Sequence, residues 1–96
     1  MEIKKTKDGS SLKLTVSGRL DTLTAPQLES ALQLEGVTEL VFDLTDLEYV
    51  SSAGLRVFLG AQKKMMLQGN MELVGVKPIV REVLDMTGFS AFFTIK

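Results

Sequence analysis

Two adjacent serines, Ser51 and Ser52, stand directly before a segment whose apolar residues recur at helical spacing. Backbone N–H groups at a helix start are free and the helix dipole is positive there, so this position favours an anionic group such as a phosphate. Gly54 follows two residues later, where a missing side chain would let another backbone or a bulky group come close. The same spacing fits a serine that only caps the helix, a role that contributes roughly 1 kcal/mol. From spacing alone, capping is the simpler interpretation.

Residue types that carry most enzyme chemistry are missing. The chain has no histidine and no cysteine, which removes the commonest general base, thiolate nucleophiles and the usual metal ligands. Neither serine lies in a Gly-x-Ser-x-Gly elbow, and Gly54 is the only glycine close to them, so there is no phosphate-binding P-loop. Asp21, Asp43 and the other acidic residues fit no catalytic spacing. We expect a binding domain that has no catalytic residue, no metal and no cofactor.

Length and composition limit the partners. At 96 residues, with 45% hydrophobic and 24% charged residues, the chain can form one hydrophobic core. The formal net charge of -1 provides no field that would attract nucleic acid. No run reaches the roughly 18 apolar residues of a membrane helix, and the segment from Met1 to Lys7 lacks an apolar signal sequence. We expect a cytoplasmic protein without membrane insertion.

Apolar periodicity predicts the first elements. Ile3 to Lys7, the Asp8-Gly9 turn and the alternation from Leu12 to Val16 indicate two strands, the second ended by Gly18. Thr24 and Gln27 form a potential capping box around Pro26, and a helix should continue until Gly36. Its expected buried residues are Leu28, Ala31, Leu32 and Leu34.

The second half continues the alternation of strands and helices. Leu40 to Leu44 is apolar enough for a central strand covered on both faces, and a connection from Asp46 to Tyr49 leads to the longest helix, which ends near Gly69. Met71 to Val76 then indicates a strand, and Pro78 begins a last helix before Gly88. The expected inward positions of these two helices are Leu55, Phe58, Leu59, Met65, Met66, Ile79, Val80, Val83, Leu84 and Met86.

The C-terminal segment leaves alternatives open. Ala91 to Ile95 fits a short edge strand or a final turn, and at least two of Phe89, Phe92 and Phe93 should close the core. The order is therefore ββαβαβα, with the later strands joined through a helix as a parallel crossover. We predict a single α/β domain over residues 1–96, with a mixed sheet of four to five strands and helices packed on it.

Three separated segments resemble the STAS domain, specifically the bacterial anti-sigma factor antagonists. They are Gly18-Arg19-Leu20-Asp21, the strand end Asp43-Leu44, and the run from Tyr49 through Ser51-Ser52-Ala53-Gly54 to Arg56. The likeness spans essentially the whole chain. It implies a partner-switching domain that, when unmodified, binds an anti-sigma factor with serine kinase activity and so releases a sigma factor. Phosphorylation would end that binding, and a metal-dependent serine phosphatase would reverse it.

The resemblance also assigns residues. It places the phosphoacceptor on Ser52, two residues before Gly54, with Ser51 as a competing acceptor. It places the partner-binding surface on Asp21, Ser51, Ser52, Ala53, Gly54 and Arg56. Asp21 equally fits a residue that forms the turn before the first helix. Asp43 could orient the serine loop by accepting backbone N–H bonds, although an aspartate at a strand end usually forms only a turn.

Two departures from the family pattern keep other functions open. Many members carry an aspartate immediately before the acceptor, where this chain has Ser51, and a serine or threonine after it, where this chain has Ala53. The alternative is therefore a STAS binding subunit that is not phosphorylated, in a lipid-transport or other regulatory assembly. A sensor of a small ligand or nucleotide is a third hypothesis.

Overall fold

The chain begins with an antiparallel β-hairpin. In the computed structural model, which describes residues 1–96, β1 (Glu2–Asp8) pairs with β2 (Ser11–Leu20) along its whole length. The turn contains Gly9 with a φ of 61°, a backbone conformation that glycine adopts without steric cost. Leu12, Leu14 and Val16 are buried. The hairpin and its apolar face are therefore as the sequence predicts.

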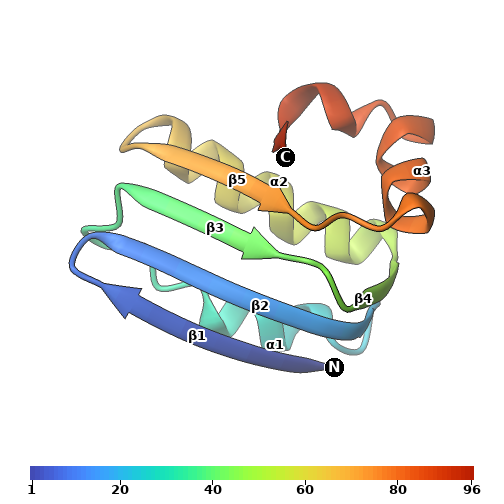
Figure 1. Cartoon of the computed structure of the whole chain (residues 1–96), viewed down its shortest axis with the longest axis horizontal. Helices are drawn as coiled ribbons and strands as arrows, with labels where there is room; N and C mark the ends of the chain where they lie inside the picture. The colour runs from blue at the N-terminus through green and yellow to red at the C-terminus, as the bar shows by residue number, and fades with distance from the viewer.

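One mixed sheet forms the centre of the molecule (Figure 1). Its strand order is β1-β2-β3-β5-β6, where β3 is Glu39–Asp43, β5 is Asn70–Val74 and β6 is Thr94–Ile95. The β2–β3, β3–β5 and β5–β6 pairs are all parallel. The chain passes from β3 to β5 through the long helix α2 (Ser52–Met66). The α/β class, the central strand and the parallel crossover are confirmed.

The sheet has six strands, more than the four to five expected. The extra strand, β4 (Leu47–Val50), lies in the segment that we expected to be a connection, and it pairs in parallel with the end of β2. Its side chains do not alternate between buried and exposed, because the register shifts between Gly18 and Arg19. Gly18 also does not end β2, which continues to Leu20.

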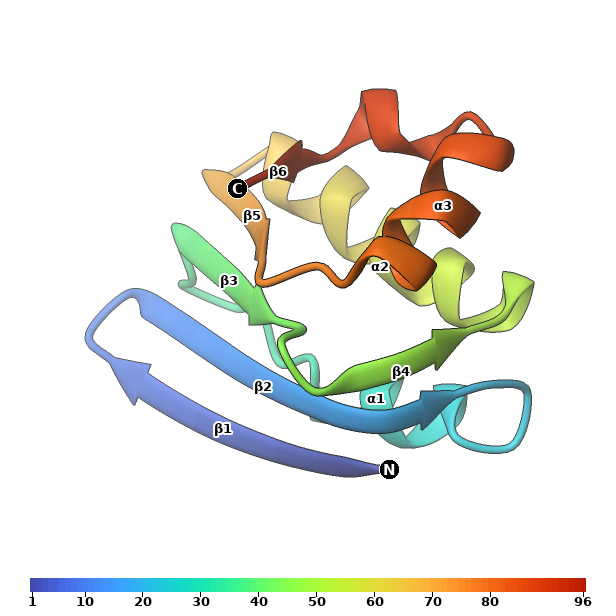
Figure 2. The ribbon, with the colours of Figure 1, turned by 45° about the vertical axis from the view of Figure 1, so that its right-hand side comes forward.

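Helices cover only one face of the sheet, as the views in Figure 1 and Figure 2 show for α1 (Ala25–Ala31) and α2. Along β3, Leu40 and Phe42 are buried, whereas Val41 and Asp43 are partly exposed. The expectation that this strand is covered on both faces is wrong. The other face of the sheet stays open to solvent because it is polar. Lys13 and Glu72 lie on that face, on the strands next to β3.

The core is one continuous cluster of 23 buried apolar residues, and no polar or charged residue is buried. Three aromatic rings connect the sheet, α2 and the C-terminal segment. The Phe42 and Phe58 centroids are 5.0 Å apart, and those of Phe58 and Phe93 are 6.4 Å apart, both in edge-on geometry. Phe89 packs on the core as a half-buried residue while Phe92 is 59% exposed. Two of the three C-terminal phenylalanines therefore close the core, as expected.

The helices differ from expectation at their ends. Helix α1 stops at Ala31 rather than near Gly36, because the chain turns away while Leu34 still enters the core. Helix α3 (Pro78–Met86) lies beside β4 in Figure 2 and is followed by a short 3-10 helix, η1 (Phe89–Phe92). Three residues expected to face inward are exposed, since they lie at helix ends beyond the packed stripe. They are Met66, Ile79 and Met86.

Candidate functional site

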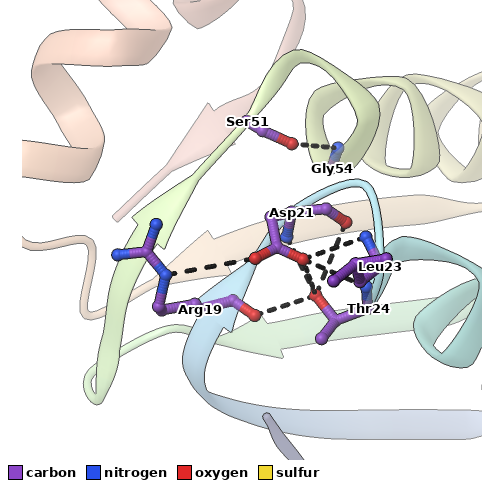
Figure 3. Close-up of polar contacts among 6 residues, drawn as sticks. All are labelled: Arg19, Asp21, Leu23, Thr24, Ser51 and Gly54. Atoms are coloured by element: carbon purple, nitrogen blue, oxygen red, sulfur yellow. Dashed lines mark hydrogen bonds and ion pairs between the residues drawn. The ribbon is translucent and has the colours of Figure 1, made fainter.

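Ser51 and Asp21 lie at the same end of the β2–β4 pair (Figure 3), and Ser52 follows Ser51 in the chain. Leu20 and Val50 are register partners in these parallel strands, and the Ser51 N–H donates a 2.8 Å hydrogen bond to the Leu20 carbonyl oxygen. Since both strands run in the same direction, the residues that follow them emerge at the same edge. The strand that the sequence did not predict is therefore what places Ser51 beside the Asp21 turn.

The two serines have different environments. Ser51 has extended backbone angles at the N-cap of α2, and its Oγ accepts a hydrogen bond from the Gly54 N–H at 3.5 Å. Ser52 is the first residue of the helix, and its side chain is exposed and takes part in no hydrogen bond. Ser51 therefore caps the helix, while the Ser52 hydroxyl faces solvent.

Gly54 sets how closely the helix approaches the strands. A Cβ at this buried position would lie 2.6 Å from Leu20 Cγ, a distance that real Cβ atoms essentially never show, and 3.0 Å from Val50 Cγ2, which is also unusually tight. The space that the missing side chain of Gly54 leaves free is therefore filled by side chains of β2 and β4, and not by a group from another molecule. This contact fixes the start of α2 against the strand ends from which the Asp21 turn also leaves.

Asp21 organises a tight turn. Its Oδ1 accepts hydrogen bonds from the Leu23 N–H at 3.0 Å and the Thr24 N–H at 3.1 Å. The Thr24 hydroxyl accepts from the Asp21 N–H and donates to the Arg19 carbonyl oxygen, both at 2.9 Å. Because this hydroxyl is already occupied, Thr24 does not form the expected capping box with Gln27. The turn presents Leu23 to solvent with 89% of its surface exposed.

The charge of Asp21 is favoured by this turn. Partial desolvation opposes ionisation, but the hydrogen bonds from Thr24 and Leu23 and the nearby Arg19 guanidinium outweigh it. The pKa of Asp21 is therefore below its usual value, and the group is an anion at neutral pH. A negative charge stands beside the serine loop.

Sequence reasoning missed Tyr49 as a member of this site and left Arg19 without a role. The two residues are register partners on β4 and β2, and Arg19 Cζ lies 4.3 Å from the centroid of the Tyr49 ring. Arg19 Nε also lies 4.0 Å from Asp21 Oδ2. Only the pairing of β2 with β4 reveals this contact, because the residues are 30 positions apart and Tyr49 was expected in a loop.

The remaining candidates divide into two groups. Ala53 is half-buried against the core, and Arg56 is exposed one helical turn after Ser52. Asp43 lies at the end of β3, where it accepts hydrogen bonds from the Thr45 N–H and hydroxyl and lies 3.8 Å from Lys13 Nζ. These contacts hold the turn after β3 and none reaches Ser51 or Ser52. Asp43 therefore acts within its own turn.

The site offers ionic and hydrogen-bonding groups for recognition. Asp21, Arg19 and Arg56 are its charged side chains, and the Ser52 hydroxyl is its free nucleophilic group. No group of three or more acidic, histidine or cysteine side chains is placed to hold a metal ion. No helix combines the length and the apolar character that crossing a membrane requires.

Known proteins match this chain over its whole length. A sequence model of the STAS domain matches residues 2–96. The anti-sigma-B factor antagonist of Listeria monocytogenes serovar 1/2a is 35% identical over 100 residues, which cover 100% of this chain and 87% of that protein. The crystal structure of an anti-sigma factor antagonist from Mycobacterium paratuberculosis is 26% identical, with a TM-score of 0.86 over 98% of this chain and 83% of that chain.

The fold is also shared with SpoIIAA, an anti-sigma factor antagonist of Bacillus. Its unphosphorylated form superposes with a TM-score of 0.84 at 18% identity, covering 99% of this chain and 88% of that chain. Its phosphorylated form gives a TM-score of 0.75 over 99% of this chain and 91% of that chain. The match extends through the strands and helices that build the site.

Proposed function

Because this chain belongs to the STAS domain family, whose relatives include anti-sigma factor antagonists at 35% identity, we propose that it is an anti-sigma factor antagonist. It binds an anti-sigma factor through the Asp21 turn and the start of α2, and so releases a sigma factor. Its role is binding rather than catalysis. The observation that carries the proposal is the exposed, unbonded Ser52 hydroxyl at the start of α2, at the same strand edge from which the Asp21 turn leaves.

Ser52 is the proposed phosphoacceptor. Its hydroxyl is exposed, whereas that of Ser51 is half-buried and occupied by the Gly54 N–H. The kinase that modifies it is the anti-sigma factor itself, and a metal-dependent serine phosphatase reverses the modification. This reaction cycle places the protein in the cytoplasm with both enzymes.

A phosphate on Ser52 is compatible with the folded domain. It adds about -1.5 to -2 charge, and a negative group in the first turn of a helix gains about 0.3 to 1 kcal/mol. Arg56 lies four residues further along the exposed side of α2, at the spacing that brings helix side chains together. The phosphate therefore has a favourable helix terminus and a cation on the same helix.

The same phosphate opposes docking of a partner. Together with ionised Asp21 it concentrates negative charge on the proposed contact surface, and like charges facing each other across an interface cost several kcal/mol. Each 1.4 kcal/mol reduces affinity about tenfold. Phosphorylation thus ends binding without unfolding the domain.

The test uses the anti-sigma factor from the same genome. Calorimetry should show that the unsubstituted chain and Ser52→Ala bind it, while Ser52→Asp binds at least tenfold more weakly. Incubation with ATP followed by peptide mass spectrometry should place the phosphate on Ser52 in the unsubstituted chain and in Ser51→Ala. Circular dichroism of Ser52→Asp should match that of the unsubstituted chain.

Three results would contradict the proposal. A kinase that is active on another substrate but leaves Ser52 unmodified would remove the phosphorylation switch. Equal binding by the unsubstituted chain, Ser52→Ala and Ser52→Asp would favour a STAS binding subunit without phosphorylation. Loss of helical signal in Ser52→Asp would replace blocked docking with unfolding.

A further inference from the structure

Beside the serine loop lies a side-chain pair, Arg19 and Tyr49, that the proposed function does not use. The Arg19 guanidinium lies over the Tyr49 ring, with Cζ 4.3 Å from the ring centroid. The two residues face each other across the β2–β4 pair, so their backbones hold the stack in place. We call these two residues the Arg19–Tyr49 platform.

The guanidinium of this platform keeps most of its donors free. Only Nε approaches Asp21, at 4.0 Å from Oδ2, and no hydrogen bond involves the two terminal nitrogens. In Figure 3 these nitrogens point away from Asp21. The Arg19 side chain is 64% exposed. A guanidinium in this state presents a planar pair of N–H groups that matches the two oxygens of a carboxylate.

Stacking prepares this group for binding. A free arginine loses considerable side-chain freedom when a partner immobilises it, but a guanidinium already held against a ring loses less. Exposed cation–π and ion-pair contacts contribute little to the stability of a fold. The arrangement therefore fixes the direction of an exposed cation and adds little to the stability of the domain.

The platform is continuous with the proposed contact surface. Tyr49 precedes Ser52 by three residues and Arg19 precedes Asp21 by two. The Asp21 carboxylate and the Tyr49 ring already hold Arg19, while Arg56 shares the helix with Ser52. These contacts favour a partner group over a phosphate on Ser52 as the ligand of Arg19.

We propose that the Arg19–Tyr49 platform determines partner specificity by binding a carboxylate side chain of the anti-sigma factor beside Ser52. This inference rests on the proposed function and names the chemistry of its partner. The anti-sigma factor must present an acidic residue where it docks on the Asp21 turn. A partner without that carboxylate leaves a desolvated guanidinium unpaired and is rejected.

The single tyrosine makes the platform directly observable. The chain contains one tyrosine and no tryptophan, so protein labelled with 3-fluorotyrosine gives one fluorine NMR signal, from Tyr49. That signal should shift when the unlabelled anti-sigma factor from the same genome is added. Binding affinity should fall about tenfold or more in both Arg19→Gln and Arg19→Lys, since lysine keeps the charge but loses the planar donor pair.

A matched control is available on the same strand. Lys13 is also exposed and lies 3.8 Å from an aspartate, Asp43, but its contacts lie away from the serine loop. Lys13→Gln should therefore bind the anti-sigma factor as the unsubstituted chain does. Unchanged thermal unfolding of the Arg19 variants would assign their loss to the interface rather than to the fold.

The outcomes separate this inference from the function on which it rests. An unshifted fluorine signal in the complex, or full affinity in Arg19→Lys, would overturn the platform while Ser52→Asp still reports the switch. If Arg19→Gln kept its affinity but altered the phosphorus NMR titration of phosphorylated Ser52, Arg19 would serve the phosphate, and the inference would be wrong. No binding by the unsubstituted chain would remove the proposed function and this inference together.

Discussion

At the scale of single residues, neighbouring small side chains have separate tasks. The Ser51 oxygen satisfies a free N–H at the start of α2, while the Ser52 hydroxyl makes no bond and stays accessible. Gly54 provides the N–H that Ser51 accepts and leaves room for Leu20. The hydroxyl that caps the helix and the proposed phosphoacceptor are therefore different groups, and a chain with Ser51 in place of the usual aspartate still has a capped helix start.

The role of Gly54 gives a prediction about stability. Gly54→Ala places a Cβ 2.6 Å from Leu20 Cγ, inside the buried core, so the helix or the leucine must move. We expect a loss of about 1 to 3 kcal/mol in the free energy of unfolding, typical of an overpacked core. Urea denaturation followed by circular dichroism measures it.

A second glycine of the same helix is the control. A Cβ at the exposed Gly60 meets no atom within 4 Å, so Gly60→Ala should gain helix propensity, up to about 1 kcal/mol, instead of losing stability. Equal effects of the two substitutions would show that helix propensity, not close packing on Leu20, governs Gly54.

At the scale of elements, the irregular end of β2 aims the Asp21 turn. Gly18 has a φ of 88°, and the register with β4 shifts directly after it. Gly18→Ala should cost about 1 to 2 kcal/mol for the left-handed conformation, and it should also weaken binding to the anti-sigma factor because Asp21 and Arg19 follow the shift.

The matched variant for Gly18 is Gly36→Ala. Gly36 has a similar φ of 74° and open space around its Cβ position, but it lies in the loop after α1. Urea denaturation should give both variants a comparable loss of stability, while calorimetry with the anti-sigma factor should detect weaker binding only in Gly18→Ala. Unchanged binding by Gly18→Ala would show that the strand irregularity does not position the contact surface.

Elements with regular local patterns were predictable from the sequence, and the short irregular ones were not. The Asp8-Gly9 turn and the apolar spacing of α2 are local signals, and both elements form as predicted. The four residues of β4 bury only Leu47 and Val50, which are three positions apart, and this spacing is not the period-2 alternation that indicates a strand. Its pairing with β2 across the shift at Gly18 is a long-range feature that no local pattern contains.

The same distinction between local and long-range signals explains which residues of the candidate site could be predicted from the sequence. Ser51, Ser52 and Gly54 are adjacent in sequence, so their spacing and the family resemblance indicated them together. Arg19 and Tyr49 come into contact only because β4 pairs with β2, and no local pattern in the sequence between them predicts that pairing. Asp43 shows the reverse case, since it lies near the motif in sequence but bonds only within its own region of the sheet.

At the scale of the whole molecule, the ionisation of three aspartates should make the free energy of unfolding depend on pH. The pKa of Asp43 is lowered mainly by the Thr45 hydroxyl. The pKa of Asp85 is lowered mainly by the Ser90 hydroxyl. Desolvation raises the pKa of Asp21, but the hydrogen bonds within its turn and the nearby Arg19 guanidinium lower it by more. Each folded pKa lies below the ordinary value of 3.8. Their stabilising contributions are complete above that value and disappear as the pH falls through the folded pKa values.

The free energy of unfolding should therefore decrease as the pH is lowered from about 5 to about 2.5, and the triple variant D21N/D43N/D85N should show a smaller decrease. Urea denaturation at a series of pH values measures both slopes. Thr45→Val should also flatten the profile in part, because it removes the hydroxyl that lowers the pKa of Asp43 while keeping the carboxylate. Equal acid slopes in the triple variant and the unsubstituted chain would mean that these three carboxylates do not link folding to pH.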